Sequence, residues 1–460
     1  MKRSRMVLPI GLLLVAAVFL TVRAIYPQQS RPNFIIIVAD DLSWNDIGAY
    51  GNSDVYTPNI DELANNGMRF TGAFLTTSSC SASRASILTG KYPHANGLVN
   101  LHQKLPASES TLGQMLGAAG YYAAAAGKWH IGGAVKGQFD VVRDGTSDDV
   151  SSDWLQLLRN RPKDKPFFLW LAAHDPHRPH DRGAAFARHY DHPSFKLPVG
   201  YVDGKGLRRE LLAYYLEVSS FDRDVGTIRE ELARQGILDD TFVLIMSDNG
   251  RPFPRGKLSL YDAGIKTPFI VHWPAGVTVP GDYSYLVSAV DIAPTLLELA
   301  GASVPADLQG SSFARVFADP QLKLRDYVFA ERNWHVQPAH ERAVRSVNFL
   351  YKENQYPRGG DCRHTPFGST VVHKALVKAH KEGRLTAAQE ACFADERPAV
   401  ELFAVRDDGV NFQNLAEDTT YAPVRREMAA QLSEWRRSTG DFDFQPEATF
   451  SPSAPVAPQQ

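Results

Sequence analysis

The stretch Asn33-Phe34-Ile35-Ile36-Ile37-Val38-Ala39-Asp40-Asp41 decides the fold of this chain. Its first six residues carry no charge and are rich in β-branched side chains, which predicts a strand that is buried on both faces of a sheet. Two aspartates end the run. Because open α/β sheets bind their ligands at the carboxyl ends of the strands, Asp40 and Asp41 are the first candidate site residues.

Later apolar runs also end in polar residues. We expect further strands at 122–126, 166–172, 241–246 and 268–273, with helical patterns between them at 57–66, 110–119, 211–235 and 290–300. This alternation of strands and helices predicts an α/β fold with a largely parallel sheet. The polar residues that follow the strands would then meet at one edge of the sheet.

The chain is expected to divide into four parts. Residues 1–30 hold a basic start and the apolar run 6–22, which predict an export signal or an uncleaved N-terminal anchor plus a linker. Residues 31–325 carry the strands above and form the expected catalytic domain. Short strand-like pieces alternate with loops over 326–445, which predicts a smaller α+β domain. Residues 446–460 are rich in Pro, Ala, Ser and Gln and are expected to be a disordered tail.

Composition sets broad limits on function. A chain of 460 residues with 44% hydrophobic content can bury a large core and a second, smaller one, and a net charge of -2 gives no overall positive field for nucleic acid. Export places the folded part outside the cytoplasm, in the periplasm or secreted. There a disulfide between Cys362 and Cys392 is chemically permitted, which leaves Cys80 unpaired.

A second oxygen-rich pair, Asp248 and Asn249, follows the apolar run 241–246. A single pair of this kind usually caps the amides of a loop. Two such pairs at one sheet edge supply three carboxylates and an amide without His or Cys. That set of ligands suits a hard cation, Ca²⁺ or Mg²⁺, rather than zinc.

Cys80 begins the stretch Cys80-Ser81-Ala82-Ser83-Arg84. A lone cysteine is most often a small buried hydrophobe, but the serines and Arg84 are poor core material. We expect Arg84 to lower the thiol pKa or to hold an anion, which makes Cys80 a candidate reaction centre. Further groups that could surround an oxyanion, and include a general acid, are Lys128, His130, His174 and Lys257. Each of these alone would be read as a surface residue.

Four motifs, taken in order, resemble those of the formylglycine-dependent sulfatases of the alkaline-phosphatase-like superfamily. They are Asp40-Asp41, Cys80-x-Ala-Ser-Arg84 with Leu88-Thr89-Gly90, Gly127-Lys128-x-His130 and Ser247-Asp248-Asn249-Gly250. The resemblance covers roughly residues 31–440 and implies a large mixed, mostly parallel sheet flanked by helices, with a smaller C-terminal α+β domain.

The resemblance also implies that Cys80 is oxidised to Cα-formylglycine (3-oxoalanine), whose hydrate supplies the nucleophile. A formylglycine-generating enzyme or an anaerobic sulfatase-maturing enzyme would be the partner for this step. The commonest modification signal has Pro where this chain has Ala82. Alanine occurs there in bacterial members, so we expect the modification.

The same resemblance implies a calcium site built from Asp40, Asp41, Cys80, Asp248 and Asn249. The metal would lower the pKa of the nucleophile. Arg84 and Lys128 would hold the hydrate, and His130 would deprotonate its second hydroxyl to release sulfate. His174 and Lys257 would bind sulfate and assist the leaving group.

Within the family, residues 100–103, 174–178 and 247–256 look like those of the sulfamidases, which remove N-linked sulfate from a terminal glucosamine of heparan sulfate. Lys257 stands where those enzymes have arginine. Either side chain can bind sulfate, but lysine lacks the two parallel N–H donors of a guanidinium. The C-terminal residues that could recognise the sugar, or could simply be surface residues, are His335, His340, Glu341 and Arg342. The same two interpretations, sugar recognition or surface residue, apply to Arg178, His180 and Arg251.

The expected activity is hydrolysis of sulfate from sulfated glycans, with N-sulfoglucosamine of heparin or heparan sulfate as the preferred substrate. One alternative is an O-sulfatase on a glycosaminoglycan or another sulfated sugar. Another is a phosphoester or phosphonate hydrolase of the same superfamily, and a third is a non-catalytic glycan-binding protein with unmodified Cys80. A sulfated saccharide is the expected partner, and no nucleic acid is.

Overall fold

The computed structural model describes residues 31–145, 150–181, 183–190, 196–335, 338–356, 370–405, 411 and 413–441. The apolar run at 6–22, Cys362 and the tail at 446–460 lie outside the described residues.

The larger sheet has eight strands in the order β5-β4-β6-β1-β7-β8-β2-β9, with β1 (Asn33–Ala39) near its middle. Strands β6 (Phe167–Ala172) and β7 (Thr241–Ser247) flank β1, and both run parallel to it. Strands β4 (Tyr122–Gly127) and β5 (Val141–Asp144) extend the parallel part. All seven residues of β7 are buried, as expected for a strand that is covered on both faces.

The other edge of this sheet makes it mixed. Strand β8 (Phe269–His272) runs antiparallel to β7, and β2 (Met68–Phe70) runs antiparallel to β8. Strand β9 (Gly281–Tyr283) pairs parallel with β2. A separate two-stranded sheet joins β3 (Ala73–Phe74) and β10 (Val287–Ser288). The predicted large mixed, mostly parallel sheet is thus confirmed.

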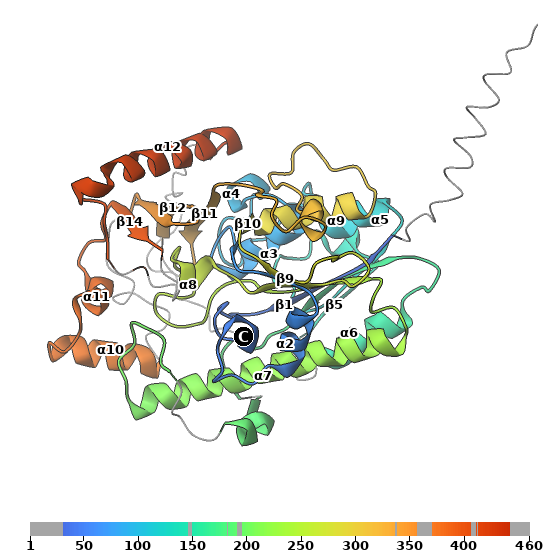
Figure 1. The fold of residues 1–460 in the computed structure, drawn as a ribbon, viewed down its shortest axis with the longest axis horizontal. Coiled ribbons are helices and arrows are strands. Elements are labelled where there is room, and N and C mark those ends of the chain that lie inside the picture. The colour runs from blue at the N-terminus through green and yellow to red at the C-terminus, as the bar shows by residue number, and fades with distance from the viewer. Residues whose placement is uncertain are drawn as a thin grey trace, which may run out of the picture.

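Helices cover both faces of the sheet (Figure 1). Alternate β1 side chains, such as Ile36, join the core under α3 (Cys80–Thr89), α5 (Leu112–Ala118) and α9 (Ile292–Leu299). The intervening side chains, such as Ile37, join the core on the opposite face. This alternation follows from the two-residue period of a strand, so one run of isoleucines builds both cores.

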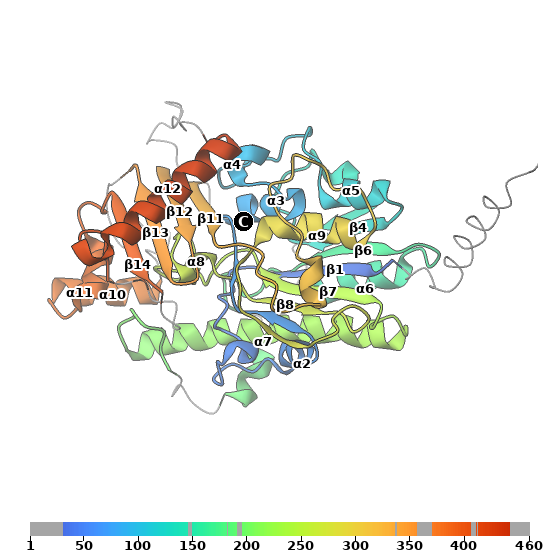
Figure 2. The same ribbon diagram turned by 45° about the horizontal axis from the view of Figure 1, so that its top comes forward.

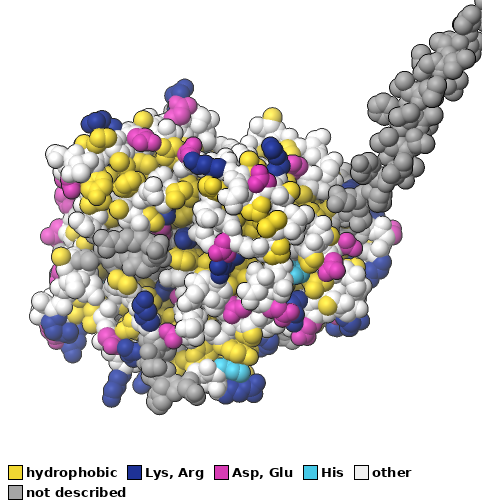
Figure 3. Space-filling model, in the orientation of Figure 1, with side chains coloured by type: hydrophobic (Ala, Val, Ile, Leu, Met, Phe, Trp, Pro, Cys, Tyr) yellow, Lys and Arg dark blue, Asp and Glu magenta, His cyan; other side chains and the backbone are white. Residues whose placement is uncertain are grey.

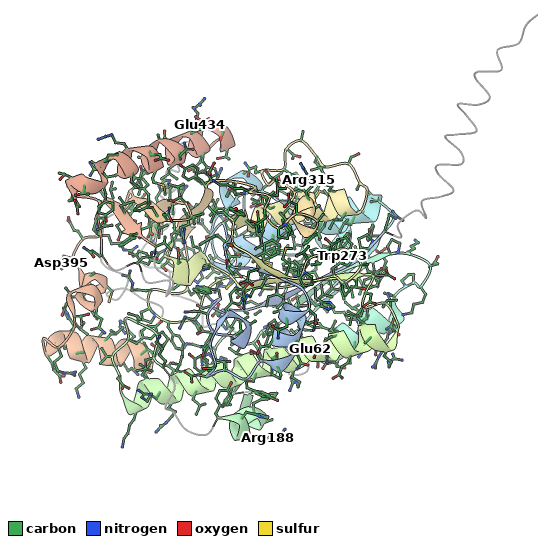
Figure 4. All side chains as sticks on the ribbon, viewed as in Figure 1. Glu62, Arg188, Trp273, Arg315, Asp395 and Glu434 are labelled. Atoms are coloured by element: carbon green, nitrogen blue, oxygen red, sulfur yellow. The ribbon has the colours of Figure 1, made fainter. Side chains whose placement is uncertain are left out.

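The opposite layer contains α2 (Pro58–Asn65), α6 (Val150–Asn160) and α7 (Lys205–Arg234). Helix α7 is the longest, at 30 residues, and it starts earlier than the expected 211–235. Figure 2 shows α7 running along the lower side of the sheet, away from α3 and α9. Figure 4 shows dense side chains between the layers, with Trp273 among them, and this residue packs against the core on the α9 side.

A smaller antiparallel sheet follows in the order β11-β12-β13-β14. Its strands are β11 (Val328–Trp334), β12 (Pro338–Arg345), β13 (Phe349–Asn354) and β14 (Val400–Ala404). Helix α12 (Ala422–Thr439) packs on this sheet through the buried residues Met428, Leu432 and Trp435. The smaller C-terminal α+β unit expected from the sequence is therefore confirmed.

Further helices and turns complete the described part of the chain. They are the helices α4 (Pro93–Asn96), α8 (Asp262–Ile265), α10 (Val371–Lys381) and α11 (Ala387–Glu390), and 3-10 turns at Gly48–Tyr50, Lys136–Gln138, Gly183–His189, Ala289–Asp291, Ala314–Phe317, Ala391–Phe393 and Thr419–Tyr421. In the described part of the chain, no helix is both long and apolar enough to span a bilayer. On the face drawn in Figure 3, basic and acidic side chains are interspersed.

Candidate active site

The pairing of β1 with β7 brings the two oxygen-rich pairs together. Ala39 lies opposite Ser247, so Asp40-Asp41 and Asp248-Asn249 leave the sheet side by side. The backbone N–H of Asp41 donates to Oδ1 of Asp248 at 3.3 Å. One side-chain ligand atom each from Asp40, Asp41, Cys80 and Asp248 lies within 4.8 Å of the others, and all four residues are buried.

Cys80 joins this cluster because it is the first residue of α3. Its Sγ lies 3.7 Å from Oδ1 of Asp40. All ten residues of α3 are buried, although the sequence suggested that its serines and Arg84 are poor core material. Small side chains let this helix fit under neighbouring segments, and hydroxyls can bond inside it, as Thr89 Oγ1 does to the carbonyl of Ala85 at 2.7 Å.

The pKa of the Cys80 thiol is not lowered, which was the first of the two roles expected of Arg84. Burial raises the pKa of Cys80 to about 12, and it outweighs the opposing pull of Lys128 and Lys257. The guanidinium of Arg84 forms an ion pair with Asp248 instead, since its Nε and Nη2 each lie 2.8 Å from Oδ2 of Asp248. The unmodified thiol therefore stays protonated at neutral pH and is a poor nucleophile.

Asn249 supplies an oxygen suited to a cation. Its Nδ2 donates to Asp41 Oδ1 at 2.6 Å and to the carbonyl of Gly250 at 3.0 Å. Its Oδ1 is buried and has no hydrogen-bond partner among the described residues. Buried amide oxygens are rarely left unpaired, so this atom together with three carboxylates fits a hard divalent metal.

Each carboxylate of the cluster also faces its own cation. Lys128 Nζ pairs with Oδ2 of Asp40, and Lys257 Nζ lies 2.6 Å from Oδ1 of Asp41. Burial alone would raise the pKa of Asp40, but Lys128 and the other nearby cations hold it well below its usual value. Arg84 also donates from Nη1 to the backbone carbonyl of Lys128 at 2.7 Å, which fixes the two cations relative to each other.

His130 has one ring nitrogen occupied and one unpaired. Its Nε2 lies 2.9 Å from Nδ1 of His102, while its Nδ1 is buried without a partner in the described structure. Burial, aided by Lys128 and Arg84, lowers the pKa of His130 to about 2, so the imidazole is neutral. When Nε2 carries the proton and donates to His102, Nδ1 is a bare acceptor.

The loop after β6 brings two more histidines, His174 and His177, toward the cluster. His174 Nε2 donates to the carbonyl of Gly145 at 2.9 Å, and burial lowers the pKa of His174. His177, which the sequence motif contained without a role, places Nε2 3.8 Å from Oδ2 of Asp41. The backbone N–H of Asp40 donates to the carbonyl of Asp175 at 3.0 Å, so this loop is fixed to the segment that carries Asp40 and Asp41.

The end of β11 brings His335 beside the start of α3. The backbone N–H of Leu101 donates to the carbonyl of Trp334 at 3.2 Å, which joins β11 to the loop that holds His102. His335 Nδ1 lies 2.9 Å from Oγ of Ser79, the residue before Cys80. Arg178 pairs with Glu210, and its guanidinium lies over the ring of Phe253 at 5.1 Å.

The structure does not bring His340 and Arg342 to this cluster. Both are 1% exposed. Arg342 donates to the two oxygens of Asp441 at 2.6 and 2.8 Å and to Oδ1 of Asn333 at 2.9 Å. These contacts tie β12 to the end of α12. Glu341 is buried beside them, at 2% exposed.

Sequence reasoning assigned no role to His102 or His177, although both lie in motifs that it singled out. Their contacts with His130 and Asp41 depend on how two separate loops close over the cluster, which spacing along the chain does not reveal. His180 Nε2 lies 3.1 Å from the carbonyl of Pro176 and stabilises the second of these loops.

Comparison with known proteins agrees with this geometry. Residues 32–302 match the Sulfatase family, and residues 256–355 match the family "N-sulphoglucosamine sulphohydrolase, C-terminal". Human N-sulphoglucosamine sulphohydrolase is 30% identical over 90% of this chain and 91% of its own length. An ulvan-active sulfatase of Formosa agariphila is 27% identical over 91% of this chain and 77% of its own.

Solved structures share the fold. A protein in complex with its substrate D-glucosamine-2-N,6-O-disulfate superposes with a TM-score of 0.72 at 21% identity, over 90% of this chain and 99% of that one. A 2-O glycosaminoglycan sulfatase gives 0.69 at 23% identity, over 90% and 93%. The chain belongs to the sulfatase family and is a hydrolase of sulfate esters or sulfamates.

Proposed function

We propose that this protein removes the N-linked sulfate from glucosamine units of heparin or heparan sulfate, using Ca²⁺ and a formylglycine made from Cys80. The observation that carries the proposal is the buried cluster in which Cys80 lies beside Asp40, Asp41 and Asp248. The choice of substrate is supported by the similarity to human N-sulphoglucosamine sulphohydrolase along nearly its whole length.

The charges of the cluster suit an anionic substrate. Its carboxylates and cations form three pairs, namely Asp40 with Lys128, Asp41 with Lys257 and Asp248 with Arg84. The protein charges therefore cancel, and a bound divalent cation leaves the site with two positive charges. Because the cluster is buried, this charge is screened little by solvent and attracts a sulfate group strongly.

Each catalytic residue then has a distinct task. Asp40, Asp41, Asp248 and Asn249 would hold Ca²⁺, which would lower the pKa of a hydroxyl on the hydrated aldehyde of residue 80, the proposed nucleophile. Arg84 and Lys128 hold the hydrate, and Lys257 binds the sulfate oxygens. His130 accepts the proton of the second hydroxyl at its bare Nδ1 when sulfate is released.

His174 acts on the leaving group. Because its Nε2 donates to the carbonyl of Gly145, Nδ1 is the ring nitrogen left for the leaving group. The negative charge of the bound substrate favours the protonated imidazole, and Nδ1–H then passes its proton to the departing amine. Arg178 and His335 are the proposed sugar contacts.

Export is part of the proposal. Cys392 is disulfide-bonded, and Cys80 is the free cysteine among the described residues. A structural disulfide suits an oxidising compartment such as the periplasm or the extracellular space. Residues 1–30, with their basic start and apolar run, would then act as signal or anchor.

Heparin disaccharides with sulfate at a single defined position test the reaction. Protein from a host with a maturing enzyme should release sulfate from the N-sulfated disaccharide and leave the free amine, and Cys80→Ala should release none. Release only from 6-O- or 2-O-sulfated disaccharides would refute the N-sulfatase assignment and favour an O-sulfatase. Faster turnover of an aryl phosphate than of an aryl sulfate would favour a phosphoester hydrolase.

Peptide mass spectrometry of the same preparation tests the maturation step. The peptide that contains residue 80 should carry the aldehyde, which is lighter than the thiol form. Full sulfatase activity from protein in which every Cys80 remains a thiol would refute the proposed nucleophile.

A further inference from the structure

A cavity of about 490 Å³ lies apart from the catalytic cluster. Its walls come from the segments that continue beyond the two metal-binding pairs, including Asp46 and Arg251, and from distant residues such as Tyr201 and Asn411. Among its described lining residues there is none of the catalytic or metal-binding side chains named above. This volume lies within the range of small-molecule binding sites, about 300 to 1,000 Å³.

Arg251 contributes an unpaired donor to this cavity. The residue is 3% exposed, and its backbone N–H and Nε donate to Oγ of Ser43 at 2.9 and 3.1 Å. Its Nη2 donates to Oδ1 of Asn45, and Asp46 lies 3.3 Å from Nε. Its Nη1 is buried and has no partner in the part of the chain that the structure describes. A fixed guanidinium with one donor left over is built to receive an acceptor.

Asn411 contributes a second unpaired donor. It is 2% exposed, and its Oδ1 accepts from the backbone N–H of Asp262 at 3.0 Å, while its Nδ2 is buried without a partner among the described residues. Of the described side chains that line the cavity, only Arg251 and Asn411 have such buried unpaired atoms. Both atoms are N–H donors, so the ligand has to present acceptors.

The rest of the wall indicates what carries those acceptors. Lys196, Arg251 and Arg255 line the cavity against two carboxylates, Asp46 and Asp54, which leaves one excess positive charge. The aromatic side chains of Trp44, Tyr50, Tyr201 and Tyr261 also line the cavity. An anion with a compact ring, apolar on its faces and polar at its edges, satisfies both features.

We propose that this cavity is a second binding site, for an acidic monosaccharide whose carboxylate bonds to Arg251 Nη1 and Asn411 Nδ2. The aromatic walls contact the faces of the sugar ring, and Lys196 and Arg255 add attraction at the mouth. The site requires neither formylglycine nor the catalytic metal, so it stands independently of the proposed sulfatase substrate.

The test uses D-glucuronate as the probe, with the calcium-loaded protein and calorimetric or NMR titration. The Cys80→Ala variant should bind it as tightly as the wild type does. Asn411→Asp keeps the acceptor for Asp262 but replaces the donor by a carboxylate oxygen, and it should weaken binding at least tenfold. Arg251→Lys keeps the charge but removes Nη1, and a loss of about tenfold or more is expected for a charged hydrogen bond.

Controls separate the site from general effects. Lys163→Gln removes an exposed cation whose residue does not line the cavity, and it should leave glucuronate affinity unchanged. D-glucose lacks the carboxylate and should bind at least tenfold more weakly than glucuronate. The proposal is overturned if glucuronate shows no saturable binding, if glucose binds equally well, or if folded Asn411→Asp, checked by its melting curve, retains wild-type affinity.

Discussion

Replacement of Lys257 by methionine should destabilise the protein strongly in the absence of calcium and only weakly in its presence. Lys257 Nζ lies 2.6 Å from Asp41 Oδ1, and the two side chains are 8% and 1% exposed. Removing one partner of a buried ion pair strands the other charge, which costs about 3 to 5 kcal/mol. Bound Ca²⁺ would restore a positive charge beside Asp41. The remaining cost should then fall to about 1 kcal/mol, the net worth of a hydrogen bond.

Urea denaturation of wild-type and Lys257→Met protein, each with excess calcium and with a chelator, measures both values. Lys257→Arg keeps the charge and should remain within about 1.5 kcal/mol of wild type under both conditions. Lys163→Met alters an exposed lysine and should shift stability by less than about 0.5 kcal/mol. Equal losses for Lys257→Met with and without calcium would refute the idea that the metal lies against Asp41.

Three further predictions concern the cluster and the C-terminal sheet. The Cys80→Ser variant should accept one sulfate and then stop, because serine lacks the second hydroxyl of the proposed hydrate. Intact-protein mass spectrometry should find one added sulfate. Steady turnover by this variant would contradict the mechanism. Asn249→Ala removes the unpaired Oδ1 and should weaken Ca²⁺ binding by about tenfold or more, measured by calorimetry; unchanged affinity would exclude Asn249 as a ligand. Burial lowers the pKa of His340 to about 4, so its neutral form stabilises the fold above pH 6.5, and that contribution is lost as the pH falls toward 4. The His340→Gln variant should therefore lose less stability than the wild type between pH 7 and 4.5, as measured by urea denaturation. Equal losses of stability in the two proteins would contradict this.

The sequence was sufficient to predict the sheet and the edge at which the two oxygen-rich pairs meet. The run of isoleucines in β1 specifies burial on both faces, and parallel pairing with β7 then places Asp40 beside Asp248. Both inferences rest on local patterns and on the geometry that all parallel sheets share.

Burial of α3 could not be predicted in the same way. Its serines and Arg84 look like surface residues, but Asp248, 164 positions away in the chain, satisfies the guanidinium. The same reason explains Arg342, which Asp441 holds from 99 positions away. Charged side chains are almost always exposed unless a group of opposite charge is buried with them. The partners of Arg84 and Arg342 come together with them only in the folded chain.

The burial of Cys80 has a consequence for the proposed modification. The residue is 1% exposed and belongs to a helix whose ten residues are all buried, so a second enzyme has no route to its sulfur once this helix has docked. The proposed oxidation would therefore have to act on a chain that has not yet folded. The yield of active protein would then depend on two rates, that of α3 docking and that of capture by the proposed maturing enzyme. A molecule that folds first would be well packed but inactive, and it would have to unfold again before it could be modified.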